Sequence, residues 1–174
     1  MAAGILRGFR RPADVARPLR PLSKVAAQWA QDISERWTRF GEPYERTLLD
    51  FALDQITELT SRASEEVVLH QDLHAENILR ADREPWLAID PKPLRGDPAL
   101  DAASLLRDRR DELRNDPSQA ATIRRRLDTL TELLGLDRDR LPGWGVIRAL
   151  AWAAGTSDAD RLLIDCARLL AATP

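Results

Sequence analysis

The sequence predicts a mainly α-helical protein that carries one small β-hairpin. Apolar residues recur every three or four positions through most of the chain, which is the spacing of amphipathic helices. Short β-branched or apolar runs occur only in the middle, and two of them are joined by a polar connector that ends in proline. The chain has 174 residues, enough to bury an ordinary hydrophobic core.

Composition places the chain among ordinary folded proteins. Apolar residues make up 44% and charged residues 31%, which excludes a disordered or collagen-like chain. No apolar run is long enough for a transmembrane helix, and the first residues lack the apolar stretch of a signal peptide. The single Cys166 cannot form an intrachain disulfide, which favours the cytoplasm. A net charge of −2 argues against nucleic acid as the partner.

The N-terminal region is expected to be a first short helix and an Arg/Pro-rich connector, together residues 1–21. A helix is predicted over 22–40, with Ser23 as its N-cap, because an apolar stripe begins there. Gly41 and Pro43 end that helix, and a second stripe predicts the next helix over 44–62.

The C-terminal part repeats this pattern. A stripe from Ile123 to Leu134 predicts a helix that Gly135 closes. Two further helices are predicted over 141–153 and 157–171, and all these apolar faces are expected to form the core.

The middle of the chain carries the β signals. Val67-Val68-Leu69 is a short β-branched run, and two more runs cover 78–80 and 86–89. The polar connector 81–85 between the last two predicts a small hairpin. Trp86 is expected to lie in the hairpin core rather than to stack on a nucleotide base.

Three polar residues follow these runs at spacings that suit phosphoryl transfer. Asp72 follows the first strand, Asn77 comes five residues later, and Asp90 ends the hairpin thirteen residues after Asn77. One carboxylate can meet an attacking hydroxyl, while a carboxamide and a second carboxylate offer the oxygen ligands that Mg²⁺ prefers. Strand ends can hold such groups with the accuracy that positioning requires.

The same residues resemble a known family. H-x-D-L-H-x-x-N-I-L at 70–79 is similar to the catalytic loop of aminoglycoside phosphotransferases, which belong to the protein-kinase-like superfamily. I-D-P-K at 89–92 and G-D-P-A-x-D at 96–101 resemble the branch that contains streptomycin 6-kinases and the aminoglycoside/hydroxyurea antibiotic resistance kinases. The resemblance covers roughly residues 20–170.

The resemblance implies an ATP-dependent kinase that phosphorylates an alcohol group of a small antibiotic, such as streptomycin. Asp72 would be the catalytic base or hydroxyl-orienting residue, and Asn77 and Asp90 would bind Mg²⁺. His70 would be a structural loop residue bonded to backbone. His74 stands where protein kinases usually carry a lysine, and it would support the site.

Several residues have two interpretations. Asp97 before Pro98 suits a helix N-cap, but Asp97 and Asp101 could also brace the catalytic loop, as the resemblance implies. Lys92 is either a solvated surface lysine or a contact to a phosphate of the nucleotide or to the substrate.

Two clusters also have alternative readings. His70 and His74 have the spacing of a helical zinc pair, but they lie in a loop pattern without a third His or a nearby Cys. Acidic residues of the later helices could hold a cationic acceptor or form solvated helix faces. They are Asp108, Asp111, Glu112, Asp158 and Asp160.

The nucleotide-binding lobe of such a kinase is not recognisable in the sequence. The single G-x-G, Gly143-Trp144-Gly145, lies far downstream of Asp90, and Lys24, the only lysine before the loop, lies in a helical stripe. We therefore expect a C-terminal lobe alone over 22–174, with its catalytic loop at 70–77 and its metal-binding segment at 86–101.

A lobe of this kind has alternatives to independent activity. It could bind metal and acceptor weakly without catalysis, or require a separate nucleotide lobe or a dimer partner. Its exposed lobe face would then be apolar and prone to self-association. A chance match in an unrelated helical regulator is the remaining reading.

Overall fold

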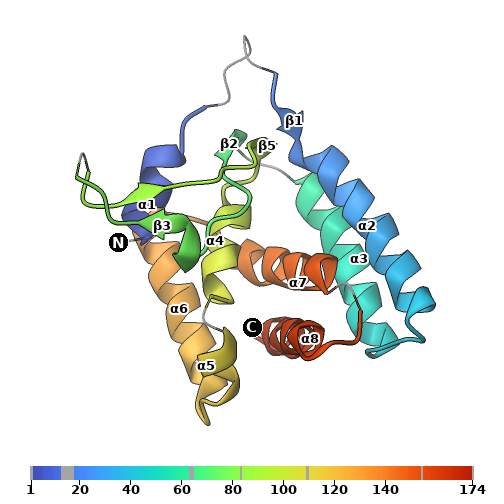
Figure 1. Cartoon of the computed structure of the whole chain (residues 1–174). Coiled ribbons are helices and arrows are strands. Elements are labelled where there is room, and N and C mark those ends of the chain that lie inside the picture. The colour runs from blue at the N-terminus through green and yellow to red at the C-terminus, as the bar shows by residue number, and fades with distance from the viewer. Residues whose placement is uncertain are drawn as a thin grey trace.

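The computed structural model describes residues 2–12, 18–62, 65–82, 84–108, 110–153 and 155–173. The helices, shown in Figure 1, are α1 (Ala2–Phe9), α2 (Leu22–Arg39), α3 (Arg46–Ser61), the 3₁₀ turn η1 (Ala75–Asn77), α4 (Ala99–Leu106), α5 (Arg110–Arg114), α6 (Gln119–Leu134), α7 (Arg140–Trp152) and α8 (Asp158–Ala171). The strands are β1 (Arg20–Pro21), β2 (Val67–Leu69), β3 (Ile78–Leu79), β4 (Leu87–Ala88) and β5 (Leu94–Gly96). The prediction of a mainly helical fold is confirmed.

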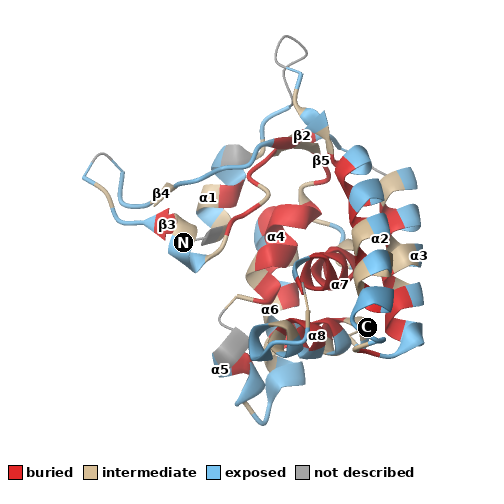
Figure 2. Cartoon of the chain, turned by 45° about the vertical axis from the view of Figure 1, so that its right-hand side comes forward, coloured by how far each residue is buried: buried red, intermediate tan, exposed pale blue. Residues whose placement is uncertain are grey.

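Helix α7 lies at the centre of the helical body, with α8, α3, α4 and α2 packed around it. Its residues 141–151 are all buried, as the red ribbon in Figure 2 shows. Gly143 and Gly145 permit this packing, because a Cβ at Gly143 would overlap Gln55 of α3 and one at Gly145 would lie 2.7 Å from Cδ1 of Leu170 in α8. The G-x-G therefore serves close helix contact and is part of no phosphate-binding loop.

The other long helices follow the apolar stripes closely. Gly135 ends α6 with a φ of 59°, in the left-handed conformation that glycine tolerates best. Ser157 begins α8 through a capping box with Asp160. The expectation of Ser23 as the N-cap of α2 is wrong, since this helix already begins at Leu22. Pro21 takes the N-cap place because it is held extended, paired with Arg95 in a strand.

The predicted hairpin is formed by β3 and β4, in which Ile78 pairs with Ala88 and Leu79 with Leu87. The prediction that Trp86 lies in the hairpin core is wrong, because this residue is 42% exposed. A two-stranded ribbon has an open face, and Trp86 lies next to the strand without a third layer to cover it.

A second small sheet, with strand order β1-β5-β2, was not evident from the sequence. β5 runs antiparallel to β2 and parallel to β1. Pro21 is accommodated because β1 is an edge strand of only two residues. This sheet places the start of the catalytic loop, after β2, beside the chain that enters α4 after β5.

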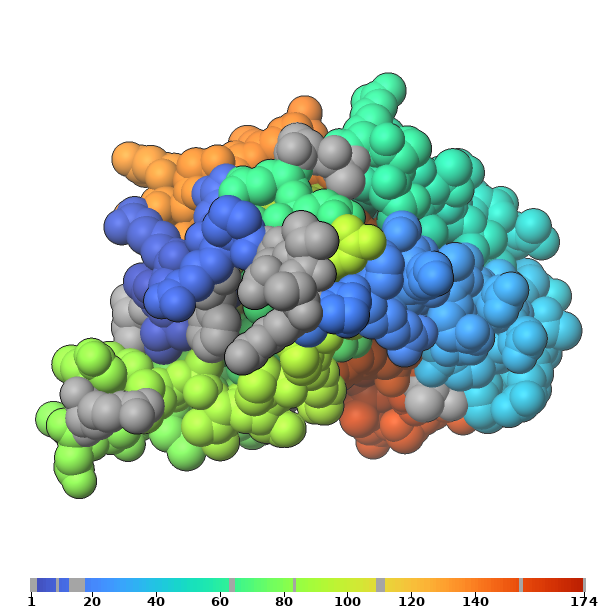
Figure 3. Space-filling model, turned by 90° about the horizontal axis from the view of Figure 1, so that it is seen from above, coloured from blue at the N-terminus to red at the C-terminus, as the bar shows by residue number. Residues whose placement is uncertain are grey.

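The N-terminal helix α1 packs against α6 and α4. Seen from above, this dark blue segment borders the orange α6, while the yellow-green hairpin lies at the corner away from α2 and α3 (Figure 3). Arg7 and Arg10 donate hydrogen bonds to the carbonyls of Leu133 and Leu134, which end α6. The predicted first helix is confirmed, and positions 13–17 of the connector lie outside the described residues.

None of the described helices is both long and apolar enough to span a bilayer.

Gly96→Ala is expected to destabilise the fold by about 1–3 kcal/mol, because a Cβ at Gly96 would overlap Cβ of Leu22, an atom that cannot move without its helix. The measurement is urea unfolding followed by circular dichroism. Gly4→Ala in α1 is the matched control, because nothing lies within 4 Å of its added Cβ and alanine favours a helix. Equal stability of the two variants would contradict a close contact between β5 and α2.

Candidate functional site

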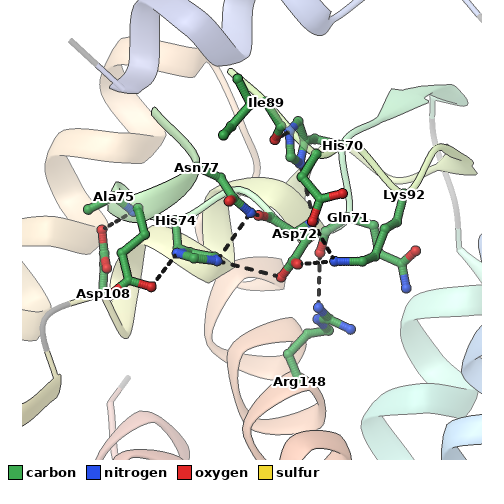
Figure 4. Close-up of polar contacts among 12 residues, drawn as sticks. His70, Gln71, Asp72, His74, Ala75, Asn77, Ile89, Lys92, Asp108 and Arg148 are labelled. Carbon is green, nitrogen blue, oxygen red and sulfur yellow. Dashed lines mark hydrogen bonds and ion pairs between the residues drawn. The ribbon is translucent and has the colours of Figure 1, made fainter. Parts of the chain in front are cut away.

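The predicted catalytic loop, residues 70–77, connects β2 to β3 and brings Asp72 to a lysine from the chain that follows the hairpin. The Nζ atom of Lys92 forms an ion pair with the Asp72 carboxylate and lies 3.4 Å from Oδ2 of Asp90 (Figure 4). Asp72 is only 7% exposed. The pKa of Lys92 is raised, chiefly by its contact with Asp72, so the lysine stays charged. Lys92 is therefore part of the site and not merely a solvated lysine.

Asn77 is oriented by the loop that it closes. Its Nδ2 donates to the carbonyl oxygen of Asp72 over 2.8 Å and lies 3.2 Å from Nε2 of His74. Its own carbonyl accepts from the backbone N–H of Ile89 at 3.0 Å, which ties it to the hairpin. The amide nitrogen is engaged inside the loop, so the amide oxygen is the atom left for a cation.

His70 is the backbone-bonded structural residue that the sequence predicts. It is fully buried, and its Nε2 lies 3.0 Å from the carbonyl oxygen of Ile89. Its Nδ1 accepts from the backbone N–H of Asp72 at 3.3 Å. The neutral tautomer with its proton on Nε2 satisfies both contacts. Both ring nitrogens of His70 thus bind backbone groups and join the loop to the hairpin. Neither nitrogen is available for a zinc pair with His74.

Asp101 braces the start of the catalytic loop from α4. Its two carboxylate oxygens accept from the backbone N–H groups of His70, at 2.7 Å, and Gln71, at 2.8 Å. Burial raises the pKa of the Asp101 carboxyl, and those two donors oppose the rise. The bracing role that the resemblance implies for Asp101 matches this geometry.

Asp97 has a different set of partners. One oxygen accepts from the backbone N–H of Ala99 at 2.9 Å, which caps the start of α4. The other accepts from Arg140 and from the indole N–H of Trp144, each at 2.7 Å. Asp97 therefore caps α4 and also ties it to α7, while Asp101 is the residue that holds the loop.

Two non-glycine residues of the site adopt left-handed backbone conformations. Gln71 has a φ of 69° and Asp90 a φ of 54°. Such conformations cost about 1–2 kcal/mol each and persist where surrounding contacts enforce them. These two backbone conformations help to direct the carboxylates of Asp72 and Asp90 toward Lys92.

His74 and Asp108 support the far side of the loop. The Nε2 of His74 lies 4.0 Å from Oδ1 of Asp72. A carboxylate oxygen of Asp108 accepts from the backbone N–H of Ala75 at 3.0 Å, which links the loop to the end of α4 (Figure 4). His74 was expected only to support the site, and its Nε2 lies near both the Asp72 carboxylate and the side-chain amide of Asn77.

A cavity of about 400 Å³ opens beside Asp72. It is bounded by the catalytic loop, by the end of α4 and by the end of α7, and its lining residues are Asp72, Leu73, His74, Ala75, Glu76, Ser104, Arg107, Asp108, Glu112 and Trp152. Among the described residues of this wall, four side chains are carboxylates and Arg107 is the only Lys or Arg. The wall is thus predominantly acidic.

The predicted acidic residues divide between two places. Asp108 and Glu112 line this cavity. Asp160 instead forms the capping box of α8, and Asp158 pairs with Arg161 on the same helix. The side chain of Asp111 lies outside the described residues.

The described residues contain no group of three or more His, Cys, Asp or Glu side chains arranged to hold a metal. Asn77 and Asp90 offer one amide oxygen and one carboxylate, and Asp90 has a 66% exposed side chain. That donor set fits Mg²⁺, which usually completes its shell with water and nucleotide phosphates rather than with a protein cage.

The sequence profile of the aminoglycoside/hydroxyurea antibiotic resistance kinases matches residues 1–159. The chain belongs to this family. Among curated proteins, this family member is 40% identical over 152 residues to the streptomycin 6-kinase of Streptomyces glaucescens and 38% identical over 152 residues to that of Streptomyces griseus. It is 36% identical over 132 residues to the hydroxyurea phosphotransferase of Kitasatospora aureofaciens.

The matched regions differ in the share that they cover. They include 86% of this chain for both streptomycin 6-kinases but 49% of each of those proteins, and 76% against 36% for the hydroxyurea phosphotransferase. The kinase family member described here thus spans about half the length of these relatives.

A solved structure supports the kinase-like fold. The choline kinase LicA of Streptococcus pneumoniae superposes with a TM-score of 0.59, at 14% identity, over 97% of this chain and 61% of that one. This family member therefore has a kinase-like fold.

Residues of α7 near the site were missed by sequence reasoning. Arg148 is 2% exposed and donates to the carbonyl of Gln71 at 2.9 Å, and Trp152 lines the cavity. A signal was present, because Arg148 is the one charged residue between Leu141 and Gly155. A lone charge inside an apolar helix indicates a buried partner.

Proposed function

We propose that this chain forms the catalytic lobe of a cytoplasmic kinase that transfers the terminal phosphoryl group of ATP to a hydroxyl of a small cationic antibiotic, an aminoglycoside such as streptomycin. The observation that carries the proposal is the convergence of Asp72, Lys92 and Asp90 at one edge, beside the acidic cavity. The family and its streptomycin 6-kinase relatives support the choice of acceptor.

In this mechanism Asp72 orients the acceptor hydroxyl and takes its proton late in the transfer. The transition state of phosphoryl transfer is mostly dissociative, so the hydroxyl needs accurate placement more than early deprotonation. Asp72 is suited to this role because it lines the cavity and its backbone is held on both sides.

Lys92 bridges Asp72 and Asp90 before substrates bind. Its charge keeps the two carboxylates together despite their mutual repulsion. A phosphate group at this edge would meet the same ammonium group, so Lys92 is proposed to contact the transferred phosphoryl group.

Asn77 and Asp90 are the proposed Mg²⁺ ligands. A bound Mg²⁺ would neutralise charge on the nucleotide phosphates. The protein's own contribution is orientation: Asn77 is fixed by the Asp72 carbonyl, and Asp90 is fixed by its left-handed backbone.

The acidic cavity is the proposed acceptor site. Asp108, Glu112 and Asp72 line the same cavity, so a cationic acceptor held by Asp108 and Glu112 would have its hydroxyls near the Asp72 carboxylate. Hydroxyurea carries no positive charge and uses none of this complementarity, which favours an aminoglycoside over the acceptor named in the third relative.

The test is phosphorylation of streptomycin by the purified chain with radiolabelled ATP and Mg²⁺, followed by thin-layer chromatography. Label is expected to move to streptomycin, and excess EDTA is expected to stop it. Asp90→Asn should lower the rate by about 100-fold because one Mg²⁺ ligand loses its charge. Glu84→Gln, an exposed carboxylate in the hairpin turn, is the control. Labelling of hydroxyurea but not streptomycin would overturn the acceptor assignment.

A second candidate is a catalytic lobe that works only when joined to a separate nucleotide-binding lobe. Three large apolar side chains are exposed along the hairpin: Leu79 at 46%, Trp86 at 42% and Ile89 at 40%. Exposed apolar side chains on a two-stranded hairpin suit contact with another protein surface.

Adding the N-terminal half of the Streptomyces glaucescens streptomycin 6-kinase to the purified chain tests this candidate. Activity that appears only in the mixture would support it. A dimer in gel filtration with unchanged activity would instead indicate self-association.

A further inference from the structure

Gln71, the residue before Asp72, has both backbone polar groups bound by buried charged side chains. Its N–H donates to Asp101 of α4 at 2.8 Å, and its carbonyl accepts from Nη2 of Arg148 of α7 at 2.9 Å. Gln71 is also in the left-handed region, with a φ of 69°. The two contacts therefore hold a strained peptide in place directly next to the proposed catalytic carboxylate.

Arg148 is itself held rigidly. Its guanidinium carbon lies 4.9 Å from the centre of the Trp29 ring and 4.7 Å from that of Trp152, so indoles of α2 and α7 both contact the cation. The pKa of Arg148 is lowered to about 9, chiefly by burial and also by nearby Arg107, while Asp72 and Asp101 oppose the fall. The group is still charged at neutral pH.

Burying an unpaired arginine costs folding free energy, so a buried Arg148 needs a structural or functional reason. Figure 4 shows Arg148 pointing from α7 toward the loop, below Gln71 and Asp72. Oδ1 of Asp72 is buried and makes no hydrogen bond within the described residues, and its Oδ2 contacts only the half-exposed Lys92 there. Within the described residues, the Asp72 side chain thus has one hydrogen-bonded partner, a half-exposed lysine, and a His74 nitrogen 4.0 Å from Oδ1, so its direction also depends on its backbone.

We propose that Arg148 is a positioning residue, which sets the direction of Asp72 by holding the carbonyl of Gln71. This inference rests on the proposed phosphotransferase function. In this proposal, Trp29, Arg148 and Trp152 form a stack that affects the rate of transfer rather than substrate binding. Because Trp152 also lines the acceptor cavity, the stack joins the wall of that cavity to the loop.

The first experiment compares Arg148→Met with Arg36→Met in steady-state kinetics. Arg36 is the matched control, because it also donates from a guanidinium to a carbonyl of α7, that of Ala151 at 2.9 Å, but away from the loop. Arg148→Met is expected to lower kcat by about 100-fold, as a misplaced group does, with KM for both substrates within about threefold. Unchanged kcat, or an equal loss in Arg36→Met, would overturn the proposal.

A double-mutant cycle with Asp72→Asn separates positioning from general damage. If Arg148 acts through Asp72, Arg148→Met should lower the residual kcat of Asp72→Asn by less than about threefold. A full 100-fold loss in that background would mean that Arg148 does not act through Asp72. If Arg148→Met does not fold, Arg148→Lys takes its place. It keeps the charge but not the planar stack, and its kcat is expected to fall by about 10-fold.

Hydrogen exchange tests, independently of activity, whether Arg148 and Asp101 clamp the backbone of Gln71. The amides of Gln71 and Asp72 should exchange at least about 10-fold faster in Arg148→Met than in the wild-type chain, and at the wild-type rate in Arg36→Met. If the wild-type chain phosphorylates nothing, alone or with the added N-terminal half, the proposed function fails, and hydrogen exchange still tests whether Arg148 holds the loop. Unchanged exchange of both amides would refute the clamp itself.

Discussion

Asp72→Asn is expected to lower the rate of phosphoryl transfer by about 100-fold or more without changing the fold. The substitution keeps the shape of the side chain but removes the oxygen that can accept the hydroxyl proton. It also removes the charge that holds Lys92, so the lysine should turn toward Asp90. The measurement is kcat with ATP and streptomycin at saturating Mg²⁺, together with circular dichroism and a urea unfolding curve.

Asp82→Asn is the matched control for this experiment. Asp82 is an exposed carboxylate in the turn of the hairpin, and its variant should keep the wild-type rate. A loss of less than about threefold in Asp72→Asn would mean that another residue meets the acceptor hydroxyl, and the proposed mechanism would fail. A large loss of stability in the variant would instead assign Asp72 a structural role.

Asp97→Ala is expected to lower the free energy of unfolding by about 3–5 kcal/mol. Asp97 is 5% exposed, and its removal leaves the guanidinium of Arg140 and the indole N–H of Trp144 without an acceptor that both share. It also removes the cap on Ala99. Since whole domains are stable by only about 5–15 kcal/mol, the variant should be close to unfolding at 37 °C.

Urea unfolding at 25 °C measures this loss, with two comparisons. Asp97→Asn keeps acceptor oxygens in place and should lose clearly less stability than the alanine variant. Asp116→Ala removes a half-buried acceptor at the start of α6, which binds only neutral groups of Ser118 and Thr122 within the described residues, and should cost far less. If Asp97→Ala and Asp116→Ala are equally stable, the link from α4 to α7 contributes nothing beyond a surface cap.

The two predictions separate carboxylates that the sequence pattern places close together. Asp97 joins two helices of the body, whereas Asp101, one turn later on α4, reaches the catalytic loop. Loss of Asp97 should therefore appear mainly in stability, and loss of Asp72 mainly in rate. A kinase-like lobe built in this way keeps its site rigid by attaching the loop to the most buried part of the body.

Much of the fold was predictable because its signals are local. The stripes of α2, α3, α6, α7 and α8 repeat at the helical period, and Gly135 and Ser157 mark helix ends by their own chemistry. The strands β1 and β5 were missed, because two or three residues contain no period and Arg20-Pro21 pairs only with a partner distant in sequence. Trp86 was misplaced for a related reason, since its exposure depends on which face of the hairpin another layer covers.

The sequence by itself determined the helical class, the hairpin and the chemical identities of Asp72, Asn77 and Asp90, because spacing along the chain is enough to recognise a loop and its following strands. Only the tertiary structure decided that Lys92 pairs with Asp72, that Asp97 binds α7 and that Arg148 holds Gln71. These contacts join residues 20 to 77 positions apart. Their formation depends on how helices pack, and packing depends on the whole apolar core rather than on any local pattern.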